Sequence, residues 1–370
     1  MKIGVLTSSR ADFSIYLPLL KELQKDAFFD LEIIAFGTHL SHFHGYTIRQ
    51  IEEEGFTVNY TIESMLVSDS KEGIATAMSL TMMKFSTFWK EHYKNFDLVF
   101  CLGDRYEMFA AVMASVPFQV KFAHLHGGEK TLGAIDNVFR HALSHASMIH
   151  FTSTEQYKRR IEEMIDEPNH IYHVGALSLD NLLTIRLLSI EEFKAKWGID
   201  LTVPTVLTTF HPETINVDLN IKYAEELSYS IIEASKKYQF IITMPNVDTS
   251  GNSIREIFKE RFSGLKNVFL IENLGTQSYF TVMKHSNFLL GNTSSGIIEA
   301  ASFGKYVINL GERQHGRACG NNVIQTDITS GAIDVSIAAI ENTPEYLGGN
   351  IYYKAGATDA IINILKTGHE

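Results

Sequence analysis

The sequence predicts an α/β protein of two doubly wound domains, each a parallel sheet covered by helices, that face one another across a cleft. Its 370 residues are more than one hydrophobic core usually organises. Short runs rich in Val, Ile, Leu and Phe alternate with amphipathic segments along the chain. These runs are apolar nearly throughout, as in residues 98–102, which is typical of strands buried on both faces of a parallel sheet.

The apolar runs place the strands of each domain in order. In the first domain, residues 1–175, the predicted strands are 3–6, 31–36, 57–61, 98–102 and 120–125. Residues 176–199 are helical and linker-like, and we assign them to a linker. In the second domain, residues 200–355, the predicted strands are 203–209, 240–244, 268–271, 288–290 and 306–309. Helices such as 223–237 and 294–303 lie between them, and the terminal segment 358–365 can pack on either domain.

Composition and charge exclude several classes of protein. Hydrophobic residues make up 45% of the chain, and its two cysteines, Cys101 and Cys319, are too far apart in sequence for a metal clip or redox pair. This pattern favours a reducing cytoplasm. No stretch has the length of a signal peptide core or a membrane span, so we expect a cytoplasmic protein without a membrane partner. The net charge of −11 comes from intermixed acids and bases, so we expect no nucleic-acid partner.

Polar residues follow the first and fourth predicted strands. Residues 7–12 place Arg10 and Asp12 after three hydroxyl side chains, which can bond backbone or phosphate oxygens. Alternatively, Ser9 or Asp12 caps the next helix. After the fourth strand, Asp104 precedes an arginine, which is how a cleft receives an acid or base tuned by a cation. Asp104 can also be a helix cap.

The densest group of polar residues follows the fifth strand. It comprises residues 124–129, with His126 and Glu129, and then Asp136 and Arg140 in the next helix. Strand alternation would place residues 124 and 126 on one side, and the paired glycines would allow a ligand to approach the backbone closely. Asp136 and Arg140 share a helix face, so a plain surface ion pair is the alternative.

A metal site is a further hypothesis, because the chain has 15 histidines. His39, His42 and His44 lie close together in a loop with aromatic residues and glycine. They lack both zinc-type spacing and accompanying cysteines. We therefore expect no metal.

In the second domain, residues 291–301 follow an apolar strand and open a helix. The segment 292–296 offers backbone N–H groups, a helix dipole and the hydroxyls of Ser294 and Ser295, which suit a diphosphate. Glu299 could accept both hydroxyls of a ribose. A small-residue helix cap is the alternative, and the segment is neither a Walker loop nor a dinucleotide fingerprint. His211 and the arginines of residues 311–317 would add polar and positive groups.

With these motifs assembled, the sequence resembles the UDP-N-acetylglucosamine 2-epimerases, specifically the hydrolysing branch that feeds sialic acid and related nonulosonic acid synthesis. The markers, specific only in combination, are residues 7–12, 103–107, 126–129, 136 with 140–141, 291–296 with 299, and 313–317. The resemblance implies a fold like the two-Rossmann GT-B glycosyltransferases, with a final helix at about 356–370 returning to the first domain. It also implies no metal or other cofactor and a homodimer.

The resemblance further implies elimination followed by hydration. A base removes the C2 proton, UDP leaves C1 to give a 2-acetamidoglucal, and water adds at C1 with protonation of C2 from the other face. Asp104, Asp136 and Arg140, with His126 or Glu129, match the catalytic group. Many members carry glutamate at the position of His126. In this chain, His126 or Glu129 can take the place of that glutamate as one acid or base.

The resemblance implies that the remaining matched residues bind UDP. They are Arg10, Asp12, His211, Asn292, Ser294, Ser295, Gly296, Glu299 and Arg313. Two substrates stay open, UDP-N-acetylglucosamine and UDP-2,4-diacetamido-2,4,6-trideoxyglucose. A non-hydrolysing epimerase, a glycosyltransferase and a non-catalytic UDP-sugar sensor are the rival functions.

Overall fold

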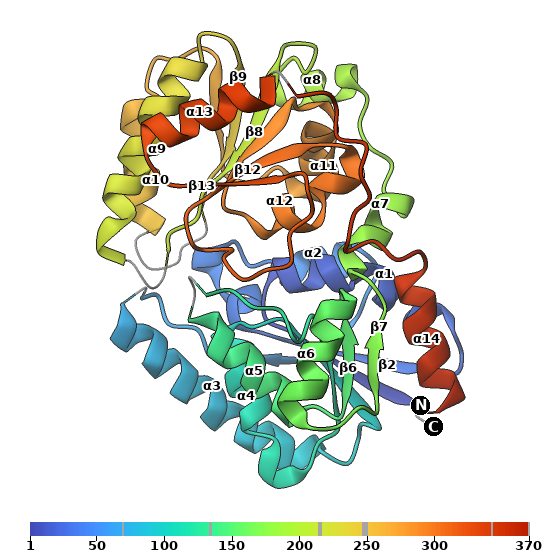
Figure 1. The fold of residues 1–370 in the computed structure, drawn as a ribbon. Helices are drawn as coiled ribbons and strands as arrows, with labels where there is room; N and C mark the ends of the chain where they lie inside the picture. The colour runs from blue at the N-terminus through green and yellow to red at the C-terminus, as the bar shows by residue number, and fades with distance from the viewer. Residues whose placement is uncertain (69, 133–134, 214–216, 246–250, 342, 369–370) are drawn as a thin grey trace. The chain divides into compact units, whose positions relative to one another are not determined.

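The computed structural model describes residues 1–68, 70–132, 135–213, 217–245, 251–341 and 343–368. The chain divides into two compact units (Figure 1). The first unit contains Met1–Glu129, Asp136–Thr184 and Tyr352–Glu370, and the second contains Lys130–Ile135 and Ile185–Ile351. Residues 176–184 thus belong to the first unit and residues 185–199 to the second.

The first unit is built on a parallel sheet of seven strands in the order β3-β2-β1-β4-β5-β6-β7. The strands are β1 (Lys2–Thr7), β2 (Asp30–Phe36), β3 (Val58–Ile62), β4 (Leu98–Leu102), β5 (Phe122–Leu125), β6 (Ile149–Thr152) and β7 (Ile171–His173). The five predicted strands are present. The prediction missed β6 and β7, because these strands are only four and three residues long and each contains a histidine.

Helices cover both faces of this sheet. They are α1 (Arg10–Lys25), α2 (Ile48–Glu53), α3 (Lys71–His92), α4 (Tyr106–Met113), α5 (Asp136–Ala146), α6 (Glu155–Ile165), α7 (Asp180–Thr184) and α14 (Ala357–Thr367), with short 3₁₀ turns η1 (Gly37–Leu40), η2 (His42–His44), η3 (Val116–Phe118) and η4 (Leu177–Leu179). Helices α1, α2 and α14 contribute to one hydrophobic cluster and α3, α4 and α5 to another. The sheet therefore has a separate apolar core on each side.

Helix α14 comes from the far end of the described chain and belongs to the first unit, where it lies beside α1 (Figure 1). Its residues Ile361 and Leu365 are buried in the same hydrophobic cluster as α1. The first turn of the helix is held by Asp180, whose carboxylate accepts a hydrogen bond from the Thr358 backbone N–H at 2.7 Å. The hydroxyls of Tyr157 and Tyr352 join the incoming segment to α6 at 2.8 Å.

The second unit is built on a parallel sheet of six strands in the order β10-β9-β8-β11-β12-β13. The strands are β8 (Thr205–Thr209), β9 (Gln239–Thr243), β10 (Val268–Ile271), β11 (Phe288–Gly291), β12 (Tyr306–Leu310) and β13 (Val323–Thr326). The helices are α8 (Ile190–Trp197), α9 (Asn220–Ala234), α10 (Gly251–Arg261), α11 (Gly275–His285), α12 (Ser294–Ile298) and α13 (Ser330–Glu341), with η5 (Val217–Leu219) and η6 (Ala300–Phe303). The prediction missed β13, an edge strand that is only partly buried over most of its length.

These two parallel-sheet units confirm the predicted fold class. The helix predicted over 294–303 is shorter than expected, because α12 ends at Ile298 and a 3₁₀ turn follows it. Within the described residues, no helix has both the length and the apolar character needed to cross a lipid bilayer.

Candidate active site

The predicted site residues lie at or just beyond the carboxyl ends of strands in both units. In the first unit they follow β1, β4 and β5 or lie in the first two turns of α5, and in the second they follow β8, β11 and β12. Because neighbouring strands are parallel, these ends gather at one edge of each sheet, where α/β proteins bind their ligands.

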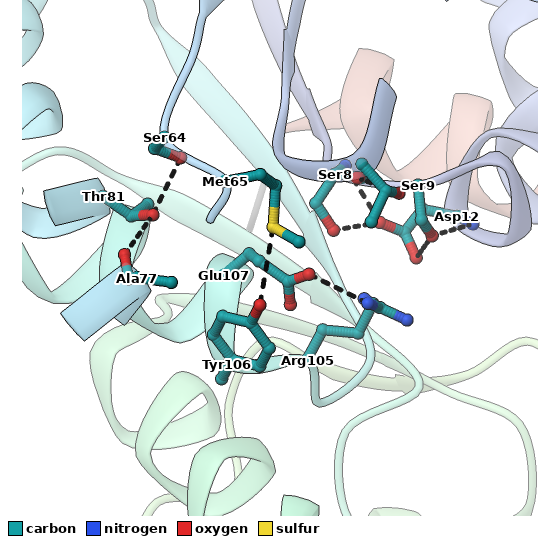
Figure 2. A network of polar contacts seen from close by, with 11 residues as sticks. Ser8, Ser9, Asp12, Ser64, Met65, Ala77, Thr81, Arg105, Tyr106 and Glu107 are labelled. Atoms are coloured by element: carbon teal, nitrogen blue, oxygen red, sulfur yellow. Dashed lines mark hydrogen bonds and ion pairs between the residues drawn. The ribbon is translucent and has the colours of Figure 1, made fainter. Parts of the chain in front are cut away.

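The turn between β1 and α1 is organised around Asp12 (Figure 2). The Asp12 carboxylate accepts hydrogen bonds from the Ser8 backbone N–H (2.9 Å), the Ser8 hydroxyl (2.6 Å) and the Ser9 hydroxyl (2.9 Å). Ser9 is the N-cap residue, since its hydroxyl accepts the Asp12 N–H. Of the two capping candidates, Ser9 therefore caps α1, while Asp12 braces the turn that carries Arg10. Burial lowers the pKa of Arg10.

The centre of the first unit's polar group is an ion pair between Asp104 and Arg140. Arg140 is 1% exposed, and it also donates a hydrogen bond from Nη1 to the Glu129 backbone carbonyl at 3.1 Å. The interpretation of Arg140 as half of a plain surface pair is therefore wrong, because its charge is buried and paired. The side chain of Asp104 remains 26% exposed, so a ligand can reach its carboxylate.

A second buried charge lies at the start of α4, the helix after β4. Glu107 is fully buried, and its Oε1 accepts a hydrogen bond from Arg105 Nη2 at 2.8 Å (Figure 2). This carboxylate lies within the motif 103–107, but nothing in the motif indicated a role for it. Its position in the first turn of an otherwise apolar helix was the available signal, since acidic residues are rarely fully buried without a partner.

His126 and Glu129 form a hydrogen-bonded pair in the loop after β5. His126 Nδ1 lies 2.8 Å from Glu129 Oε1, and the Ser153 hydroxyl donates to the same oxygen at 3.1 Å. A carboxylate only accepts, so Nδ1 carries a proton and Nε2 of a neutral ring is free of one. The side chain of His126 is 10% exposed and that of Glu129 is 3% exposed. Of the two candidate acid or base groups, the imidazole is the more accessible.

The backbone of this loop departs from the expected strand alternation. Strand β5 ends at Leu125, and His126 has a φ of 62°, so the period-2 argument does not reach His126. The paired glycines do allow another group to approach the backbone closely, but that group is part of the protein and not a ligand. A Cβ on Gly128 would lie 2.5 Å from the Tyr157 carbonyl oxygen of α6. The glycine pair therefore allows the loop to pack against α6.

Asp136 is the first residue of α5 and is partly exposed. It lies one helical turn before Arg140, as the sequence predicted. Two of the three histidines considered for a metal have separate partners, and the side chain of His44 lies outside the described residues. His39 is fully buried between the hydroxyls of Thr7 and Thr47, each 2.9 Å away, and His42 stacks on Tyr46. Among the described residues, no group of three or more His, Cys, Asp or Glu is placed to hold a metal ion.

In the second unit, His211 is fixed by the side chain of Asn292. Asn292 accepts a hydrogen bond from the His211 backbone N–H at 2.7 Å and donates one to the His211 carbonyl at 2.8 Å. Asn220 makes the same pair of bonds with the backbone of Glu213, at 2.8 and 2.9 Å. The two amides therefore clamp both ends of the turn after β8. The side chain of Asn292, predicted to bind UDP, acts in the structure as a clamp.

Strand β11 requires glycine at its last position. Gly291 has a φ of 145°, and a Cβ there would lie 2.0 Å from the Thr209 carbonyl oxygen. That oxygen accepts a hydrogen bond from the Asn292 N–H at 3.0 Å. Only glycine lets β11 approach β8 closely enough for this bond.

Helix α12 then begins with the predicted serines. Thr293, not a serine, is its N-cap residue, and its hydroxyl accepts the Ser295 N–H. Gly296 packs tightly against Val307 of β12. Glu299 is 7% exposed and is the C-cap residue of this short helix. The hydroxyls and early N–H groups predicted to bind a diphosphate are thus at the start of a helix, and Glu299 closes its other end.

Sequence reasoning assigned no role to two residues near this loop, Tyr279 and Gln314, although Gln314 lies within the marker 313–317. Tyr279 lines a small cavity together with Gly291 and Thr293, and burial raises its pKa. Gln314 is 2% exposed and donates a hydrogen bond to the Asn292 carbonyl at 2.8 Å, and Arg313 Nη1 donates to the same oxygen at 3.3 Å. Tyr279 lies in an ordinary amphipathic helix, so no sequence signal separated it from core residues.

Known proteins are similar to this chain over nearly its whole length. Residues 21–366 match the family model described as UDP-N-acetylglucosamine 2-epimerase. A Legionella pneumophila protein named UDP-N,N'-diacetylbacillosamine 2-epimerase (hydrolyzing) is 33% identical over 368 residues, covering 99% of this chain and 96% of the relative. The polysialic acid biosynthesis protein P7 of Escherichia coli is 31% identical, covering 99% of this chain and 93% of the relative.

The fold is also similar to solved structures. The crystal structure of a UDP-GlcNAc 2-epimerase from Neisseria meningitidis bound to UDP-GlcNAc aligns with a TM-score of 0.81 and covers 100% of both chains. The two sequences are 19% identical. This similarity supports the architecture of two parallel-sheet units.

Proposed function

The chain belongs to the UDP-N-acetylglucosamine 2-epimerase family, and from this membership we propose that it is a hydrolysing 2-epimerase of a UDP-N-acetylhexosamine. It converts the substrate and water into UDP and a free sugar of the N-acetylmannosamine type. All atoms come from the substrate and water, and no net oxidation occurs, so the reaction requires no cofactor. The observation that carries the reaction type is the group of hydrogen-bonded ionisable residues in the first unit, Asp104, Glu129, His126 and Arg140.

We propose that the first half-reaction eliminates UDP. A base removes the C2 proton, the electron pair forms the C1–C2 double bond, and UDP leaves with the C1–O bond electrons. The C2 proton is weakly acidic, so stabilisation of the departing diphosphate supplies much of the acceleration. Ser294, Ser295 and the N–H groups of α12, with Arg313, His211 and Arg10, would supply it, while Glu299 would hold the ribose.

In the second half-reaction, water adds at C1 of the 2-acetamidoglucal and a proton returns to C2 from the opposite face. His126 can accept or donate one of the transferred protons through Nε2, because the hydrogen bond to Glu129 keeps the other ring proton on Nδ1. Asp104 and Asp136 would serve as the other acid and base groups. Arg140 holds the Asp104 carboxylate in place.

For the substrate, we propose UDP-2,4-diacetamido-2,4,6-trideoxyglucose, which is UDP-N,N'-diacetylbacillosamine. The Legionella relative, 33% identical over nearly the whole chain, is named for this sugar. The product would then enter nonulosonic acid synthesis, and the 31% identical Escherichia coli relative is named a polysialic acid biosynthesis protein. UDP-N-acetylglucosamine is the competing substrate.

Incubation of the protein with each UDP-sugar in deuterated water tests the reaction. We expect NMR to show UDP release, a free 2-epimerised sugar and deuterium at C2. Epimerised UDP-sugar without free sugar would identify a non-hydrolysing epimerase, and binding without turnover would identify a sensor. UDP release without C2 exchange would refute the elimination.

Matched variants test the residue roles. Asp104→Asn should lower turnover by about 100-fold or more and leave UDP affinity unchanged, since its role is proton transfer. Ser295→Ala combined with Glu299→Ala should instead weaken UDP binding. Asp200→Asn is the control, because it removes an ion pair with Lys194 (2.7 Å) away from the strand ends. Full turnover in Asp104→Asn would remove Asp104 from the mechanism.

We also propose that the protein is a homodimer, as the family resemblance implies. The candidate contact is an exposed stripe of α3 without charge, formed by Ala75, Ser79, Met82, Met83 and Ser86. Met83 alone is 63% exposed. Analytical ultracentrifugation should show a dimer that Met83→Lys converts to a monomer, and a wild-type monomer would contradict the proposal.

A further inference from the structure

We propose that His124 is a positioning residue, whose ring ties together the three chain segments that carry the ionisable groups of the first unit. The inference rests on the proposed function. It assigns His124 a role in geometry, with no proton exchange between its ring and the substrate. The proposed reaction itself does not use this residue.

The first contact of the ring is with the segment before Asp104. His124 Nε2 lies 2.9 Å from the Gly103 carbonyl oxygen. A carbonyl only accepts, so Nε2 carries the proton and donates it. This bond fixes the peptide that leads into Asp104, at a glycine with a φ of 73°.

The second contact is with α5, the helix that carries Arg140. His124 Nδ1 lies 3.1 Å from the Ser144 hydroxyl, one helical turn beyond Arg140. Because Nε2 holds the proton of the neutral ring, Nδ1 accepts from the hydroxyl. The same ring therefore bonds to segments that carry both members of the Asp104–Arg140 ion pair.

The third contact is with the loop between His126 and Glu129. A Cβ on Gly127 would lie 2.9 Å from His124 Nδ1 and 3.1 Å from the Ser144 oxygen. The loop backbone thus packs directly over the His124–Ser144 hydrogen bond. A larger or differently shaped residue at position 124 would displace this loop as well.

The surroundings of His124 keep it out of proton transfer. The residue is 0% exposed, so its ring cannot contact a ligand. Burial lowers its pKa to about 4, and the Gly103 hydrogen bond and the charge of Glu129 only partly oppose that shift. The ring therefore stays neutral near pH 7, with one tautomer selected by its two partners.

Three substitutions at this site separate positioning from chemistry. His124→Gln keeps an N–H that can reach the Gly103 carbonyl, His124→Asn is too short to do so, and His124→Phe keeps the ring shape alone. Ser144→Ala is the matched control, since it removes only the second contact. Each variant is measured for kcat, KM, UDP affinity and hydrogen exchange of the peptide spanning residues 103–107.

We expect His124→Gln to retain kcat within about fivefold, with exchange as in the wild type. His124→Asn and His124→Phe should lose about 100-fold or more in kcat, with KM and UDP affinity unchanged, because small misplacements of reacting groups cost rates of that size. Exchange in residues 103–107 should rise about tenfold or more in both. Ser144→Ala should lose only a few-fold in kcat.

Two results would overturn the inference. One is a folded His124→Phe or His124→Asn protein with wild-type kcat and exchange. The other is a His124→Gln protein as inactive as His124→Phe but with wild-type exchange, which would mean that the imidazole itself does chemistry. If His124→Phe fails to fold, the Gln and Asn pair decides.

Failure of the proposed function would be visible separately. In that case the wild-type protein would release no UDP from either sugar, whereas the exchange measurements do not depend on turnover. Wild-type inactivity with the predicted exchange pattern would refute the reaction and keep the positioning role. Wild-type activity with unchanged exchange in His124→Asn would support the reaction and refute the positioning role.

Discussion

Replacement of Gly291 by alanine should destabilise the second unit and weaken UDP binding together. The added Cβ would lie 2.0 Å from the Thr209 carbonyl oxygen, whereas real Cβ contacts below 3.0 Å essentially never occur. Strands β8 and β11 would therefore have to separate by about 1 Å at the pair formed by these residues. That shift would also break the hydrogen bond from Asn292 N–H to Thr209.

The size of the effect follows from these contacts. A non-glycine residue at a φ of 145° costs about 1–3 kcal/mol in backbone strain. Overpacking adds about 1–3 kcal/mol, and the lost hydrogen bond about 1 kcal/mol. Relaxation will overlap these contributions, so we expect a loss of about 3 kcal/mol or more in the free energy of unfolding.

Urea denaturation and UDP titration calorimetry measure the two effects. Trp197 lies in the second unit and Trp89 in the first, so fluorescence with exchange mass spectrometry assigns the transition to a unit. Gly331→Ala is the matched control, because Gly331 lies in α13 and, apart from its chain neighbours and the backbone of its own helix, no described residue comes within 4 Å of the position that the added methyl group would take. Its stability should change by less than about 1 kcal/mol. Wild-type denaturation and UDP affinity in Gly291→Ala would refute the reasoning.

Three further predictions concern the first unit. Burial lowers the pKa of His124 to about 4 and of His150 to about 3. The unfolded rings bind protons from about pH 6.5 downward, so the folded unit should lose stability as the pH falls from about 6.5 toward 4. Urea midpoints measured at several pH values check this loss, and a midpoint that does not change with pH contradicts it. His150 is fully buried, and neither ring nitrogen has a hydrogen bond of normal geometry within the described part of the chain, so His150→Leu should raise the midpoint and flatten the acid loss; a lower midpoint would show that the imidazole is stabilising. Asp180→Ala should cost about 1 kcal/mol by removing the acceptor for Thr358 N–H, with faster exchange in α14, and unchanged exchange would exclude that capping role.

Much of the fold could be predicted from the sequence because buried parallel strands are apolar throughout. The runs at 98–102 and 288–290 carry that signal without interruption, and both are strands. Strands β6, β7 and β13 escaped because they are three or four residues long and contain polar residues. So short a run cannot be distinguished from a loop by periodicity.

The motifs located the strand ends correctly, but they could not give the partners of each side chain. Asn292 was predicted to bind UDP from its place in the loop, yet its amide is occupied by the backbone of His211, 81 residues away in sequence. Arg140 could be a surface residue by spacing alone, and only its contacts with Asp104 and with the Glu129 carbonyl show it buried. Such contacts join distant segments, so local pattern does not encode them.

The return of α14 to the first unit has a consequence for the order of synthesis on the ribosome. The second unit comes almost entirely from one continuous stretch, residues 185–351, and can complete its sheet as soon as that stretch has emerged. The earlier-translated unit must wait for Ile361 and Leu365 to cover α1. The unit that is synthesised first is therefore completed last. Until α14 has been synthesised, the apolar residues of α1 that it covers stay exposed to chaperones.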